Sequence, residues 1–172
     1  MTTLETRRAQ TAGKSTRDSR RLSAGEATRT LPLPQLPYAD AVHAALAEAR
    51  IAPGVMEAGL RKRDPSNPRS RPELYLRLFW LPDHPALAAA AEEGGLILSW
   101  SGVTGWSAHN PTDVRLLPVD ALADPALIAD AARHYARHGL IKEWVHPFQA
   151  RWSEAVYLDI ALVKFDEREV LL

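Results

Sequence analysis

The sequence contains no cysteine. Disulfides, thiolate nucleophiles, iron–sulfur clusters and cysteine-based zinc sites are therefore excluded. The absence also fits a reducing compartment, and we expect a cytoplasmic protein. Residues 1–30 hold no apolar run of the kind that a secretion signal needs, and no stretch approaches about 18 consecutive apolar residues. The sequence therefore predicts a soluble chain with no membrane partner.

Signatures of common catalytic and cofactor sites are missing as well. The sequence has no G-x-S-x-G elbow, no dinucleotide-binding glycine pattern and no zinc-deaminase pattern. The AGKS at residues 12–15 lacks the earlier glycine of a phosphate-binding loop, because Arg8 stands at that position. We therefore expect no cofactor, assign no catalytic residue and favour an interaction protein over an enzyme.

Length and charge suggest one domain with a separate basic arm. The 172 residues, 46% of them apolar, suffice for one core. Residues 1–30 hold seven Lys and Arg against three Asp and Glu, which leaves 14 against 18 in the remainder. Because residues 1–30 carry few large apolar side chains, we expect residues 1–36 to form a disordered basic arm and a Pro-rich connector.

Residue periodicity predicts an α+β domain over residues 37–140. The expected elements, in order, are a helix over 38–50, strands over 55–62 and 73–81, a short helix over 86–93, strands over 96–100 and from 106, and a helix over 124–139. Residues 114–119 are apolar enough to extend the sheet. We expect a small antiparallel sheet of about four strands with helices packed on one face, followed by an extra C-terminal helix or strand.

Three segments carry a likeness to known proteins, namely PYADAVHAALAEA, LILSWSGVTGW and ADPALIADAARHYARHG. Through them the chain resembles a small actinobacterial domain family of unknown function over about residues 37–139. The most specific element is the apolar strand followed by Trp, a turn and Gly-Trp. The resemblance implies an α+β domain, and it brings no catalytic residue, substrate or cofactor with it.

The segment LILSWSGVTGW predicts a hairpin in which Trp100 and Trp106 flank the turn. A three-residue loop with Gly105 in the left-handed conformation places both indoles on the same face of the sheet. We favour a core role for both, with Trp106 nearer the rim. The alternative is a ligand platform formed by Trp106 and His109, which would also be the pocket of a small enzyme.

Two histidines, His134 and His138, have the one-turn spacing of helical zinc ligands. A metalloprotease helix needs Glu directly after the first histidine, and Tyr135 stands there instead. Basic residues before Gly139 also complement the carboxyl end of a helix dipole. We therefore favour a helix-end role and assign no metal site.

The loop RKRDPSNPRSRP, residues 61–72, is a candidate nucleic-acid contact. Its cationic residues, opposed by a single acidic residue, are Arg61, Lys62, Arg63, Arg69 and Arg71. Together with the basic arm they could neutralise several phosphates, so a nucleic-acid-binding accessory protein is the second functional hypothesis. Aromatic residues for base stacking are missing from both segments, and an ordinary solvated loop is the alternative.

Residues 141–172 are a packing or docking segment. The stretch from Phe148 to Leu172 contains no Gly or Pro, and we favour one helix over the competing strand across 156–165. A helix aligns four large apolar side chains, namely Trp152, Val156, Ile160 and Val163. This stripe is too apolar to stay bare in water. The leading hypothesis is a non-enzymatic interaction module that docks a partner protein or a second copy through these residues.

Overall fold

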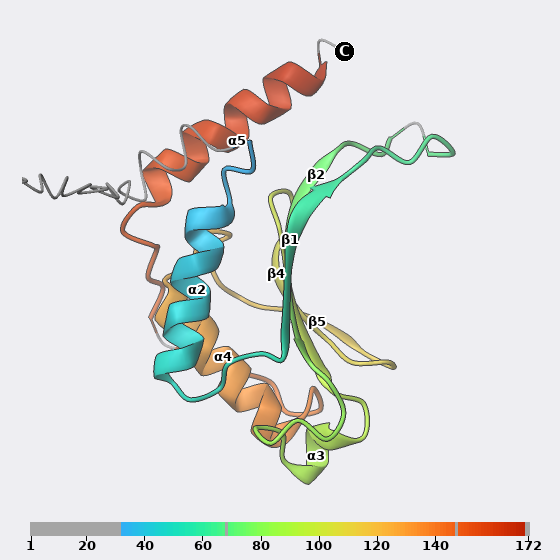
Figure 1. Ribbon diagram of the computed structural model, residues 1–172, viewed down its shortest axis with the longest axis vertical. Helices are drawn as coiled ribbons and strands as arrows, with labels where there is room; N and C mark the ends of the chain where they lie inside the picture. The colour runs from blue at the N-terminus through green and yellow to red at the C-terminus, as the bar shows by residue number, and fades with distance from the viewer. Residues whose placement is uncertain (1–31, 68, 147, 171–172) are drawn as a thin grey trace, which may run out of the picture.

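The computed structural model describes residues 32–67, 69–146 and 148–170 (Figure 1). The expected disordered arm falls on residues 1–31, outside the described residues. In chain order the elements are α2 (Leu36–Glu48), β1 (Val55–Arg61), β2 (Glu73–Trp80), α3 (Ala89–Glu92), β3 (Leu96–Ser101), β4 (Gly105–His109), β5 (Val114–Leu116), α4 (Pro125–His138) and α5 (Ala155–Val170). The α+β class is confirmed.

The five strands form one antiparallel sheet in the order β1-β2-β3-β4-β5, so every strand pairs with its neighbours in sequence. The fifth strand, β5, lies within residues 114–119, the apolar segment that the sequence suggests as an extension of the sheet. Helices α2 and α4 lie against one face (Figure 1). Strand β2 alternates as predicted, because Leu74, Leu76, Leu78 and Trp80 are all buried beneath the helices.

The β3–β4 hairpin has the predicted turn. Gly105 has a φ of +74° and pairs with Ser101, which places Trp100 directly opposite Trp106 on the helix-covered face. Both indoles are core, as predicted. The expectation that Trp106 lies nearer the rim is wrong, because its side chain is only 1% exposed. Tyr38 of α2 covers the Trp106 indole. Strand periodicity cannot predict this contact, because it says nothing about which helix lies over the strand.

Helix α4 begins and ends where the sequence predicts. The Asp124 Oδ1 atom accepts a hydrogen bond of 2.8 Å from the Ala126 N–H and caps the first turn. Gly139 ends the helix with a φ of +64°. Between these ends, the buried face of α4 includes Ile128 and Tyr135 and packs against α2. The two helices therefore form a layer over the sheet.

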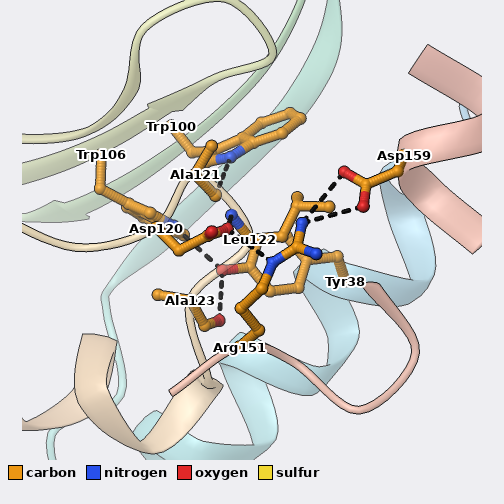
Figure 2. A network of polar contacts seen from close by, with 9 residues as sticks. All are labelled: Tyr38, Trp100, Trp106, Asp120, Ala121, Leu122, Ala123, Arg151 and Asp159. Carbon is orange, nitrogen blue, oxygen red and sulfur yellow. Dashed lines mark hydrogen bonds and ion pairs between the residues drawn. The ribbon is translucent and has the colours of Figure 1, made fainter. Parts of the chain in front are cut away.

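A hydrogen-bond network ties this layer to the sheet and to the loop before α4 (Figure 2). The buried Tyr38 hydroxyl accepts a 3.0 Å hydrogen bond from the Trp106 indole and donates a 2.7 Å bond to the Ala123 carbonyl. The Trp100 indole donates a 2.7 Å bond to the Ala121 carbonyl. The Tyr38 hydroxyl thus satisfies both a buried donor and a buried acceptor.

The segment after residue 140 packs on the domain before α5 begins. The backbone N–H of Trp152 donates to the Leu122 carbonyl, and that of Asp124 donates to the Ala150 carbonyl, both at 2.8 Å. The Trp152 ring lies 5.0 Å from that of Tyr38 and is 7% exposed. The predicted helix from Phe148 is therefore wrong for residues 148–154. These contacts hold them in a non-helical segment, which we call the strap.

We predict that Tyr38→Phe lowers the free energy of unfolding by about 2 to 4 kcal/mol. The ring is kept, but the Trp106 indole and the Ala123 carbonyl lose their common partner inside the core. Chemical denaturation measures the loss. Tyr75→Phe, which removes a hydroxyl on the uncovered face of the same sheet, is the matched control and should cost much less. Equal losses in the two variants would contradict a special role for the Tyr38 hydroxyl.

Candidate functional site

Helix α5 has one buried and one exposed apolar face. Ala155 and Leu158 are 3% and 0% exposed, and they continue the core formed by the rest of the domain. On the other side Val156, Ile160 and Val163 are 55%, 48% and 58% exposed. Their spacing of four and then three residues keeps these three side chains on one helical face.

Trp152 does not join this exposed face. It lies before the first residue of α5, and its ring packs against Tyr38 in the core. The sequence-based stripe is therefore corrected to Val156, Ile160 and Val163, which we call the α5 outer face. The predicted stripe is wrong at Trp152 because residues 150–152 are not helical. They instead pair with residues 122–124 through backbone hydrogen bonds.

The uncovered face of the sheet holds a shallow pocket of about 170 Å³. Register places Arg77, Ser99 and Ser107 side by side across three strands, with Tyr75 and His109 on the adjoining rows. Trp106 is on the opposite face, because it lies three residues from His109 in the same strand. The proposed Trp106–His109 platform is therefore wrong as a joint site.

His109 has a different partner, which period-two counting along the strand could have found. Its Nε2 atom lies 2.7 Å from the Ser107 hydroxyl. Burial lowers the pKa of the His109 imidazole, and the nearby positive charge of Arg77 lowers it further. A neutral imidazole could accept the serine proton. Among the hydrogen bonds of the described residues, however, none joins His109 to a carboxylate, so the orienting group of a catalytic triad is missing.

Arginine and tyrosine side chains line the other end of this pocket. The guanidinium groups of Arg61 and Arg77 lie 5.7 and 5.6 Å from the centroid of the Tyr75 ring. Arg61 also forms a 3.0 Å ion pair with Glu73 across the two strands. Arg61 is therefore engaged by the sheet face, and it stands apart from the other candidate nucleic-acid contacts.

The remaining basic residues occupy the loop at the end of the β1–β2 hairpin, which projects from the body of the protein (Figure 1). Lys62, Arg63, Arg69 and Arg71 are all exposed there. Asp64 organises the loop, since its carboxylate accepts hydrogen bonds from the backbone and hydroxyl of Ser66, and these bonds lower its pKa. The loop thus presents positive charge away from the core.

In the part of the chain that the structure describes, the two helical histidines have no further ligand side chains around them. The rings of His134 and His138 lie 4.9 Å apart, and the His134 Nε2 atom is 3.1 Å from the Lys142 carbonyl oxygen. Within residues 32–67, 69–146 and 148–170, no group of three or more His, Asp or Glu side chains is arranged to hold a metal ion. The same residues include no helix long and apolar enough to cross a membrane.

Comparison with known proteins places the chain in no characterised group. No family model, curated protein or solved structure matches it. The resemblance to an actinobacterial domain family therefore stays a prediction.

We predict that His109 makes the protein less stable in mild acid. The pKa of the imidazole is lowered on folding from its ordinary value of 6.5, so the unfolded chain binds this proton more readily. The free energy of unfolding should fall as the pH drops below about 6.5, and this loss should level off once folded His109 is also protonated.

Denaturant titrations at pH 7.5 and pH 5.5 test this prediction. His109→Gln should show a smaller loss of stability between the two pH values than the unmodified chain. His43→Gln, on the exposed side of α2, is the control and should keep the full loss. An unchanged pH dependence in His109→Gln would mean that other groups are responsible.

Proposed function

We propose that the protein is a non-enzymatic docking module whose α5 outer face binds in an apolar groove of a different protein. One observation carries the proposal. Val156, Ile160 and Val163 point away from the core on a helix whose opposite face is buried in that core. Spacings of four and three residues are those of helix anchors that bind in grooves.

A second copy of the chain is a poorer occupant for this face. A coiled coil between the α5 helices of two copies would need a heptad pattern sustained over several turns. The stripe cannot extend before Val156 because α5 begins at Ala155, and its next step after Val163 reaches Asp166 or Glu167, which are polar. The pocket on the open sheet face and the pocket lined by Arg50, Arg133 and Arg137 are poor apolar grooves for it, because both linings include arginines. We therefore assign the face to a partner protein with its own groove.

The magnitude of burial supports a partner that covers the whole face. Covering the exposed halves of the three side chains contributes about 2 to 4 kcal/mol in total. Association itself costs at least about 4 kcal/mol in lost freedom. The partner must therefore add contacts along the flanks of α5. Asp166 and Glu167 outweigh Lys164 there, so a basic rim would complement the helix.

Site-specific photo-crosslinking tests the proposal. A photoreactive residue placed at Val163 should form a discrete adduct with one other protein in cells that express the chain. Ile160→Asp in the same chain should abolish the adduct, because it puts a charge into the apolar contact. A photoreactive residue at Val114, which is 63% exposed on β5, is the control and should give no such adduct.

Two results would contradict the proposal. Equal labelling from Val163 and Val114 would show that α5 has no preferred partner. An adduct between two copies, together with a dimer in sedimentation that Ile160→Asp dissociates, would show that the occupant is a second copy. The intact chain is used throughout, because Trp152 and Leu158 belong to the core.

Nucleic-acid binding is the second candidate, and the projecting β1–β2 hairpin favours it. Its exposed basic loop could reach a phosphate backbone without hindrance from the body of the protein (Figure 1). Oligonucleotide binding by variants of this loop tests the hairpin while leaving α5 unchanged.

We predict that, if the loop binds nucleic acid, affinity for a short oligonucleotide falls steeply with salt. Replacing both Arg69 and Arg71 by alanine removes two phosphate contacts and should make the slope of log K against log salt shallower by about 1.5. Arg115→Ala, at an exposed arginine of β5, should leave the slope unchanged. Absence of binding at low salt, or an unchanged slope in the double variant, would eliminate this candidate.

A further inference from the structure

A second pocket lies where the carboxyl ends of α2 and α4 meet the segment before α3. Helices α2 and α4 pack against each other and end on the same side of the protein (Figure 1). The pocket has a volume of about 280 Å³, and its lining includes Arg50, Arg133 and Arg137. It is separate from the α5 outer face and from the pocket on the open sheet.

The charge of this pocket is positive and uncompensated. Among the described residues, its lining contains three arginines and no acidic side chain. None of the three forms an ion pair with another residue of the described parts of the chain. The ends of two helices contribute roughly half a negative charge each, which complements about one arginine. An excess of about two positive charges is left.

Arg50 has a backbone conformation that an arginine adopts only at a cost. It follows the carboxyl end of α2 with a φ of +58°. The Arg50 N–H bonds the Ala47 carbonyl at 3.0 Å and the Ile51 N–H bonds the Leu46 carbonyl at 2.9 Å, the hydrogen-bond pattern of a Schellman motif. Glycine is the usual residue at this left-handed position, because it has no Cβ to clash with the backbone. The arginine is therefore unfavourable for the backbone but adds a cation to the pocket.

We propose that this pocket binds a small phosphate-bearing molecule through Arg50, Arg133 and Arg137. Guanidinium groups bind phosphate oxygens in a two-point geometry, and three of them match a dianion or a pyrophosphate group. A volume near the lower limit of small-molecule sites suits a phosphate or pyrophosphate with little attached to it. The backbone strain at Arg50 is retained because its guanidinium contacts the ligand.

Thermal unfolding and titration calorimetry of the full chain with inorganic phosphate and pyrophosphate test the site. Each anion is compared with chloride at matched ionic strength, which removes general screening. Pyrophosphate should raise the melting temperature more than chloride does. Arg133→Gln should weaken its binding at least tenfold, whereas Arg115→Gln, at an exposed arginine of β5, should leave binding unchanged.

Arg50→Gly separates a ligand-binding role from a structural one. Without ligand, this variant should melt at a higher temperature than the unmodified chain, because glycine adopts a positive φ without strain. The same variant should lose at least tenfold in affinity for pyrophosphate. Higher stability combined with lost binding is the outcome that supports the site, and folding failure cannot mimic it.

Several results would overturn the proposal. They are an absence of stabilisation by pyrophosphate beyond that of chloride, an equal loss of binding in Arg115→Gln, and a lower melting temperature in ligand-free Arg50→Gly. A ten-nucleotide oligonucleotide that binds through the same arginines more tightly than pyrophosphate would overturn the small-molecule assignment and identify a nucleic-acid contact.

Discussion

The Tyr38 hydroxyl is the point at which the separate parts of this domain are joined. It accepts from the Trp106 indole in the sheet and donates to the Ala123 carbonyl in the loop before α4. Its ring lies against Trp152 of the C-terminal strap. Burial strongly raises the pKa of this hydroxyl, so it stays protonated and available as a donor. Helix, sheet, loop and strap are therefore held at one residue.

This arrangement explains how α5 can be both anchored and available. The strap and Leu158 attach the start of the helix to the core, and Arg151 bridges Asp120 and Asp159 at 3.0 and 2.9 Å. These ion pairs are partly exposed and contribute little energy, but they orient the strap relative to α5 (Figure 2). A fixed helix loses little freedom when a partner covers its outer face, which favours docking.

The two pockets differ in how their charges are used. On the open sheet face, Arg61 and Arg77 flank Tyr75, and Glu73 neutralises one of them. At the ends of α2 and α4 the arginines have no acidic neighbour in the pocket lining. The first arrangement leaves one arginine unneutralised, and the second leaves the larger net attraction for an anion. Counting arginines in the sequence cannot distinguish the two, because both pockets draw on residues from distant segments.

Local rules determined most of the secondary structure from sequence alone. Alternation predicted β2 and its buried side, Gly105 predicted the hairpin turn, and Asp124 with Gly139 predicted the ends of α4. Each of these features depends on side-chain direction or backbone conformation within a few residues. The same rules could have paired Ser107 with His109 and separated His109 from Trp106, since strand residues alternate between faces.

Contacts between distant segments decided the rest. Helical spacing alone included Trp152 in an exposed stripe, whereas its ring packs on Tyr38 and its backbone bonds Leu122. The depth of Trp106 likewise depends on a residue 68 positions away. The arginine pocket joins α4 to the segments that follow α2 and precede α3, and their order in sequence does not reveal that they meet. Sequence determined which faces are apolar, and tertiary packing determined which of them remain exposed, because burial depends on what lies opposite each face.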